Sequence, residues 1–112
     1  MDFDWEGIHK ITNAGFYLMT TEVEDPKAKV HARKLTPTME DPATGSAAGC
    51  AAAWFVKHGF AKSGERILIE QGSEIRRPSQ IFVSAQQASG KITNVRVGGR
   101  AIPMIKGALT IP

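Results

Sequence analysis

The segment Met39–Gly49, which reads MEDPATGSAAG, is the part of the chain best suited to chemistry. Two acidic residues and a proline precede Thr-Gly-Ser, and small residues follow. Thr44, Ser46 or Asp41 can cap free backbone amides, because these residue types are favoured at helix N-termini. Small side chains leave the amides open to a ligand, and the positive end of a helix attracts anions. The spacing predicts a carboxylate or phosphate site; the alternative is a cap and turn without a ligand.

A second polar stretch, Glu70–Gln80, reads EQGSEIRRPSQ and lies between two apolar segments. Arg76 or Arg77 could hold a carboxylate through two parallel hydrogen bonds. The alternative is a solvated hairpin loop with an internal ion pair to Glu74. Taken alone, the residues favour the loop.

Between these stretches, Ser46–His58 is rich in alanine and predicts a helix, with Gly59 as its C-terminal cap. The segment has almost no polar face, and a helix of that kind is normally buried on all sides. We therefore expect it at the centre of the domain. Cys50 lies within it and is expected to be a small core residue.

Segments rich in β-branched, aromatic or alternating residues predict strands on both sides of this helix. Short, glycine-rich connections favour antiparallel hairpins. The prediction is an α+β domain in which a curved, mainly antiparallel sheet or barrel wraps around one central buried helix. The expected strands are Gly15–Glu22, Ala28–Leu35, Arg66–Glu70, Gln80–Gln86, Thr93–Gly98, Arg100–Lys106 and Ala108–Ile111.

Length and composition limit the classes of protein that the chain could belong to. The 112 residues suit one domain, 1–112, with residues 1–14 expected to be less ordered. The net charge is +3, but the basic residues are scattered, so we expect no nucleic-acid partner. No apolar run is long enough to span a bilayer, and the single cysteine belongs to no zinc-type cluster. We expect a cytoplasmic protein with no membrane contact and no metal.

Several motifs in order resemble the C-terminal half of the PhzF (phenazine-biosynthesis-like) family. They are EDPATGSAA, a strand ending in QG, then RPS, and finally VxVGGxA and GxLxIP, together covering about Gly15 to Pro112. The resemblance implies a diaminopimelate-epimerase-like fold of two similar halves. In that fold each half is a curved sheet around a central helix, and the active site lies in the cleft between the halves.

The resemblance also implies roles for particular residues. Asp41 and Ser46 match the family's catalytic-site positions, and Gly45 matches its substrate-contacting glycine. The first helical turn, Gly45–Ala47, would be the anion hole. The remaining substrate-binding candidates are Thr44, Ala47 and Arg77, with the RPS element of Arg77 shaping the site. The family's catalytic glutamate and active-site histidine belong to an N-terminal half that has no counterpart in this sequence.

The implied activity is isomerisation or epimerisation of a small carboxylate-bearing metabolite by proton transfer, without a cofactor. The alternative is a module that binds small carboxylates without catalysis, or a partner subunit. We expect either a homodimer that imitates the two halves or association with a complementary half-domain. In a dimer, Asp41 of each copy could face the substrate from opposite sides.

Overall fold

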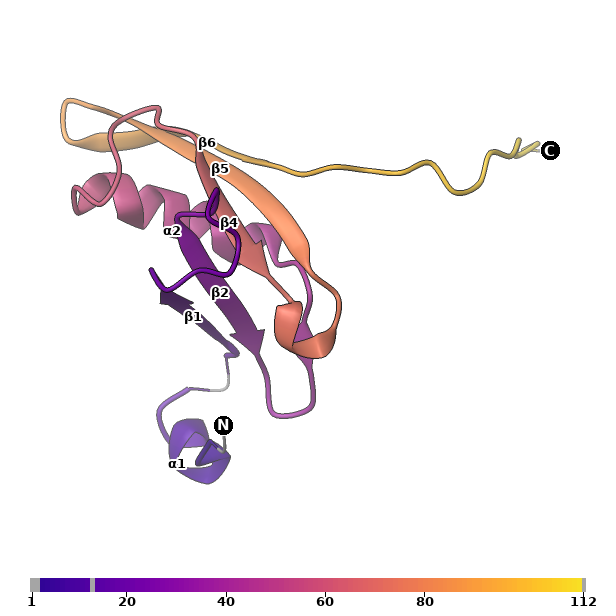
Figure 1. Ribbon diagram of the computed structural model, residues 1–112, viewed down its shortest axis with the longest axis horizontal. Helices are drawn as coiled ribbons and strands as arrows, with labels where there is room; N and C mark the ends of the chain where they lie inside the picture. The colour runs from indigo at the N-terminus through magenta and orange to yellow at the C-terminus, as the bar shows by residue number, and fades with distance from the viewer. Residues whose placement is uncertain (1–2, 13, 112) are drawn as a thin grey trace.

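The computed structural model of the protein describes residues 3–12 and 14–111. The described part is an α+β domain in which a curled sheet covers one side of a helix, forming a half-barrel (Figure 1). This confirms the predicted fold class. The elements in order are α1 (Trp5–His9), β1 (Phe16–Thr20), β2 (Val30–Leu35), β3 (Glu40–Asp41), α2 (Gly45–Lys57), β4 (Ile67–Gln71), the 3₁₀ helix η1 (Ser73–Ile75), β5 (Ser79–Ala88) and β6 (Lys91–Gly98).

The sheet has the strand order β1-β2-β4-β5-β6, and the short β3 pairs with β2. Neighbouring strands are antiparallel except β2 and β4, which pair in parallel with Val30 opposite Ile69. A parallel pair needs a crossover connection, and the chain between them supplies it through α2. The prediction of a mainly antiparallel sheet is confirmed. The predicted antiparallel hairpins did not include the parallel pair of β2 and β4.

The core lies between the inner face of the sheet and α2. Ile81, Val83 and Ala85 alternate along β5 and are all buried, as period-2 patterning requires. The alanines of α2 allow the sheet to approach the helix closely. A Cβ atom added at Gly49 would lie 3.2 Å from Cγ2 of Val97, so β6 passes directly over the helix.

The prediction that the helix is buried on all sides is wrong for this chain. Ser46, Cys50 and Trp54 recur every four residues and form an exposed stripe, with Trp54 51% exposed. Cys50 is therefore not a core residue. The sheet curls around only part of the helix, and composition alone does not show how far a sheet extends. The helix itself spans Gly45–Lys57, one residue earlier at each end than predicted.

The two strands predicted after β6 do not form. Residues 99–111 have no regular structure and are exposed, and they extend away from the domain (Figure 1). A strand needs a hydrogen-bonded neighbour, and β5 pairs with β6 only as far as Gly98. The segments Arg100–Lys106 and Ala108–Ile111 have suitable residues but no neighbouring strand among the described residues.

The N-terminal segment that was expected to be less ordered contains the short helix α1. Asp4 precedes it and its carboxylate accepts a hydrogen bond from the Gly7 amide at 2.9 Å. Residues 1–2 and 13 of this segment lie outside the described residues.

Candidate active site

The turn between β3 and α2 holds the Asp41 carboxylate in place. Asp41 is the last residue of β3 and lies opposite Lys34 of β2. Its Oδ1 accepts a hydrogen bond from the Ala43 amide at 3.2 Å, and its Oδ2 accepts one from the Thr44 hydroxyl at 2.7 Å. The carboxylate is thus fixed by the turn that leads into the helix.

The first turn of α2 has backbone amides without acceptors. Thr44 occupies the N-cap position, yet its hydroxyl donates to Asp41 and caps no amide. The first helical hydrogen bond runs from the Ala48 amide to the Thr44 carbonyl at 3.0 Å. Within the described residues, the amides of Gly45–Ala47 have no hydrogen-bond partner. Such amides, at the positive end of a helix, suit an anion.

Gly45 keeps the approach to these amides open. It is exposed, and a Cβ atom added there would contact only Cγ1 of Val97, at 3.7 Å. Ser46 is exposed beside it, and Ala47 is half-buried. The helix could therefore tolerate a side chain at position 45, whereas a ligand at the amides would compete with it for space.

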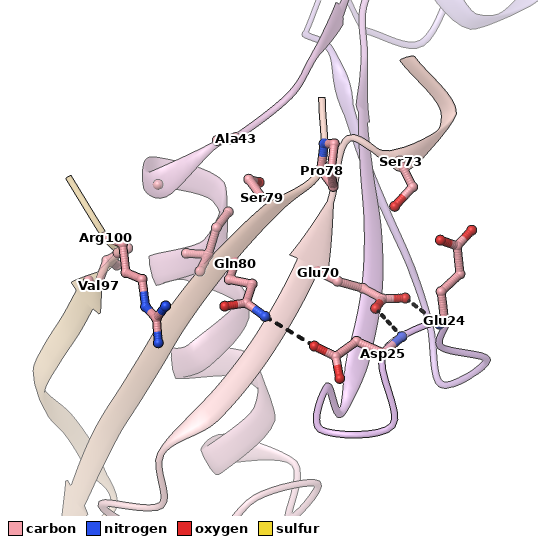
Figure 2. Close-up of a pocket in the computed structure, with 14 residues that line it drawn as sticks. Glu24, Asp25, Ala43, Glu70, Ser73, Pro78, Ser79, Gln80, Val97 and Arg100 are labelled. Carbon is pink, nitrogen blue, oxygen red and sulfur yellow. Dashed lines mark hydrogen bonds between the residues drawn. The ribbon is translucent and has the colours of Figure 1, made fainter. Parts of the chain in front are cut away.

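A pocket of about 930 Å³ opens at this junction (Figure 2). It combines the turn before α2, the start of β5, the end of β6 and an acidic loop before β2. Arg100 supplies a guanidinium group to its lining. The lining residues are Glu24, Asp25, Ala43, Gly45, Glu70, Ser73, Pro78, Ser79, Gln80, Ile81, Val97, Gly98, Gly99 and Arg100.

The structure brings most of the predicted site residues together. Asp41 and Thr44–Ala47 meet at the junction of β3 and α2, and Gly45 lines the pocket directly. Arg77 is exposed and is not among the described residues that line the pocket, although the adjacent Pro78 and Ser79 are. The RPS element therefore reaches the pocket through its last two residues.

Three residues that the sequence analysis named only within the QG and RPS motifs support this junction. Gln71 is fully buried, and its amide group bonds to the 41–44 turn. The Ser79 hydroxyl donates to the Pro42 carbonyl at 2.7 Å. Gly72 has a φ of 90°, and a Cβ atom there would lie 2.8 Å from the same Pro42 carbonyl oxygen. A glutamine and a glycine directly after an apolar strand were the available signal.

Tyr17 places a phenol in the same row as Asp41. Tyr17 of β1 lies opposite Lys34, which lies opposite Asp41. The hydroxyl is buried and has no hydrogen-bond partner in the described residues. Burial and the negative charge of Asp41 raise the pKa of Tyr17 to about 12. The phenol therefore stays neutral at physiological pH.

A charged network ties β2 to β4 and η1 next to the pocket. His31 Nδ1 lies 2.7 Å from Glu70 Oε1, and His31 Nε2 lies 2.8 Å from Glu74 Oε1. The Glu70 carboxylate also accepts the backbone amides of Glu24 and Asp25. Burial lowers the pKa of His31, but the hydrogen bonds to Glu74 and Glu70 outweigh it and raise the pKa overall. His31 thus links β2 to β4 and to η1 through its two ring nitrogens.

Neither a metal-binding group of side chains nor a membrane-spanning helix occurs among the described residues. Within 3–12 and 14–111, no three His, Cys, Asp or Glu side chains are grouped so that they could hold a metal ion. Of the described helices, none has both the length and the apolar character that crossing a membrane requires.

Comparison with known proteins places the chain in a family. The family model described as phenazine biosynthesis-like protein, PhzC-PhzF, matches residues 1–107. The chain belongs to this family. It is similar to an uncharacterised isomerase of Mesorhizobium japonicum, with 35% identity over 85% of this chain and 33% of that protein. It is also similar to the trans-2,3-dihydro-3-hydroxyanthranilate isomerase of Pseudomonas chlororaphis, with 40% identity over 65% of this chain and 26% of that protein.

Solved structures agree with this placement. A predicted epimerase of Pseudomonas aeruginosa aligns with a TM-score of 0.60 and 36% identity, covering 88% of this chain and 32% of that one. A PhzF-family protein of Bacillus anthracis shares the fold, with a TM-score of 0.63 at 24% identity over 84% of this chain and 37% of that one. This PhzF-family chain thus spans about a third of the length of the relatives it matches.

Proposed function

We propose that this chain supplies the anion-binding half of a PhzF-type isomerase site that acts on a small carboxylate-bearing metabolite. The observation that carries the proposal is the uncapped first turn of α2, next to the ordered Asp41 carboxylate and open to a pocket of about 930 Å³. The substrate carboxylate would lie at the amides of Gly45–Ala47. This assignment agrees with the isomerases among the relatives.

The chemistry proposed is a proton shift without a cofactor. A base removes a proton from a carbon atom next to an activating group, the double bond moves, and an acid returns a proton at another carbon. The reaction needs the two proton carriers and stabilisation of the developing negative charge. The free amides supply that stabilisation, and Asp41 and Ser46 are the polar partners. The principal base would come from outside this chain.

Assembly is part of the proposal, because the site is open on one side. The exposed stripe of Ser46, Cys50 and Trp54 begins at the anion site, so a partner packed along it would also reach the pocket. A second copy would bring its own Asp41 turn to the same cleft. A complementary half-domain, such as the part of the relatives that this chain does not cover, would close the cleft in the same place.

A carboxylate-binding module without catalysis is the second candidate. This candidate is favoured because His31, a histidine near the pocket, has both ring nitrogens within hydrogen-bond distance of carboxylates. The Glu70 carboxylate is likewise occupied by two backbone amides and His31. Neither group is free to act as the base.

The two candidates differ in proton exchange. The full chain would be incubated in D₂O with trans-2,3-dihydro-3-hydroxyanthranilate, the compound in the name of one relative, and followed by NMR. Deuterium incorporation that is lost in Asp41→Asn supports the isomerase. Binding without incorporation by the chain alone supports the module if incorporation also stays absent once a complementary half-domain is added, and supports the isomerase if it then appears. Neither binding nor incorporation would contradict both.

A further inference from the structure

The side chain of Gln71 is devoted entirely to the turn before α2. Gln71 ends β4 and is 0% exposed. Its Nε2 donates to the Asp41 carbonyl at 2.6 Å and to the Thr44 hydroxyl at 3.0 Å. Its Oε1 accepts the Thr44 amide at 3.3 Å. All the polar atoms of this buried amide therefore face residues 41–44.

These contacts set the direction of the Thr44 hydroxyl. A hydroxyl has one hydrogen to donate and lone pairs that accept. Because the amide nitrogen Nε2 of Gln71 acts only as a donor and donates to the hydroxyl oxygen, the hydroxyl hydrogen is available for Asp41 Oδ2, 2.7 Å away. The result is a directional chain from Gln71 through Thr44 to the Asp41 carboxylate.

The packing of the core does not require a polar residue at this position. Ile67 and Ile69 precede Gln71 on the same face of β4, and both are buried among apolar side chains. A buried amide is tolerated only when it is hydrogen-bonded, and an apolar side chain of similar size would fill the same space. What the glutamine adds is the fixed geometry of the turn.

We propose that Gln71 is a positioning residue for the anion site. It orients the Asp41 carboxylate through Thr44, and it holds the turn so that the amides of Gly45–Ala47 face the pocket. The inference rests on the proposed function and deepens it. If Gln71 were only structural, replacing it would weaken ligand binding in proportion to the loss of stability.

The test compares variants that keep size and change hydrogen bonding. Gln71→Met removes both donors and the acceptor. Gln71→Glu keeps an acceptor and would draw the Thr44 hydrogen away from Asp41. Thr44→Val breaks the chain at its middle, while Thr44→Ser keeps the hydroxyl and should rescue it. Val83→Ala, in the core on β5, is the control for lost stability without contact to the turn.

The full-length chain would be titrated with anthranilate, an aromatic amino-carboxylate, while its ¹H–¹⁵N spectrum is recorded. We expect Gln71→Met, Gln71→Glu and Thr44→Val each to weaken binding about 10-fold or more, the scale of one lost charged hydrogen bond. The double variant Gln71→Met/Thr44→Val should bind no more weakly than the single ones, because they interrupt one chain. Thr44→Ser should bind more tightly than Thr44→Val because it keeps the hydroxyl, and Val83→Ala should bind like the wild type.

The amide resonances of Ala43 and Gly45 keep this test independent of the proposed function. They should shift in Gln71→Met and Thr44→Val without ligand, and stay unchanged in Val83→Ala. A wild-type chain that does not bind anthranilate would refute the proposed site, while these shifts would still support the role of Gln71. The role of Gln71 would be refuted if Gln71→Met left both the resonances and anthranilate binding unchanged. It would also be refuted if Val83→Ala, at matched stability, lost as much binding as Gln71→Met.

Discussion

Single residues at the β3–α2 junction must leave space for a ligand and also keep the backbone folded. Gly45 leaves space next to the free amides. Thr44 occupies the N-cap position, but its side chain makes no capping hydrogen bond to a helix amide. An uncapped N-terminus costs a helix about 1 kcal/mol. The junction thus carries a local loss of stability that a bound anion would offset.

Replacing Gly45 by valine should separate these two demands. The side chain would occupy the approach to the amides, so we expect anthranilate affinity to fall about 10-fold or more. Stability should change by less than about 1 kcal/mol, since valine is no worse than glycine in a helix and only Val97 lies near. Calorimetric titration and urea unfolding measure the two effects.

The matched control is Gly49→Val, one turn further along α2. There an added Cβ atom would lie only 3.2 Å from Cγ2 of Val97, so this variant should lose stability while the amides stay open. Equal losses of stability and binding in Gly45→Val would leave only a structural role for Gly45.

Tyr17→Phe should stabilise the domain. The Tyr17 hydroxyl is buried without a partner among the residues described, and such a group costs about 1–3 kcal/mol. The phenol pKa of about 12 exceeds that of an unfolded tyrosine, so the stability of the domain falls further as pH rises from about 10 towards 12, where the unfolded chain ionises first. Urea unfolding should show a gain of about 1 kcal/mol near neutral pH.

Absorbance provides an independent check on Tyr17. It is the one tyrosine in the chain, so titration of phenolate absorbance in the folded protein reports on it alone. Ionisation near the ordinary value in folded protein, or a loss of stability in the phenylalanine variant, would contradict the buried, unpartnered hydroxyl.

At the scale of elements, the two faces of the sheet differ, because one carries apolar side chains and the other a network of charged side chains. The inner face packs on α2 through apolar side chains, whereas His31, Glu70 and Glu74 join β2, β4 and η1 beside the pocket. Both nitrogens of His31 can donate only when the ring is protonated. The connection between these elements should therefore depend on pH.

His31→Gln should reduce stability more in mild acid than in alkali. The pKa of His31 is raised in the folded state, so its contribution is complete below the unfolded pKa and is lost as pH rises through the folded one. The pKa values of Glu70 and Glu74 are lowered, so their contribution is lost as pH falls through their folded values. Urea unfolding at about pH 5.5 should show a loss of about 1–3 kcal/mol, with a smaller loss at about pH 9.

The control for this experiment is His9→Gln, which changes an exposed histidine on α1. It should affect stability little at either pH. A loss in His31→Gln that is the same at both values would show that the ring acts without a charge.

At the scale of the whole molecule, the chain leaves apolar surface uncovered. Its radius of gyration is 16.6 Å, against about 13 Å for a compact domain of this length. The excess reflects residues 99–111, where Ile102, Ile105 and Leu109 are more than 80% exposed. Exposed apolar groups on this scale normally contact a partner.

We expect the isolated chain to form a dimer along the helical stripe of Ser46, Cys50 and Trp54. Sedimentation velocity at micromolar concentrations should give twice the 12.1 kDa mass of one chain. Trp54→Glu places a charge in the stripe and should yield monomers, whereas Lys91→Glu, an exposed position on β6, should not. A strict monomer would favour a complementary half-domain as the partner, and a dimer indifferent to Trp54→Glu would show that another surface joins the copies.

Local patterns were sufficient for α2, for the five longer strands and for the turn that begins α2, but not for α1, β3 or η1. Alanine-rich composition predicted the helix to within one residue at each end, and the strand predicted at Ala28–Leu35 contains the observed β2. These signals are local, because periodicity and capping depend on residues a few positions apart. The family fold was expected from the resemblance of the ordered motifs to the PhzF family, which periodicity and capping do not supply.

Tertiary structure decided what these elements face. Residues 100–111 have strand-forming side chains but no neighbouring strand in the part of the chain that the structure describes, and Cys50 is exposed because the sheet stops before reaching it. Gln71 contacts Thr44 across 27 positions of sequence, and Tyr17 shares a row with Asp41 through β2. Such contacts depend on strand register and on the crossover through α2. No local pattern encodes which side chains a register brings together.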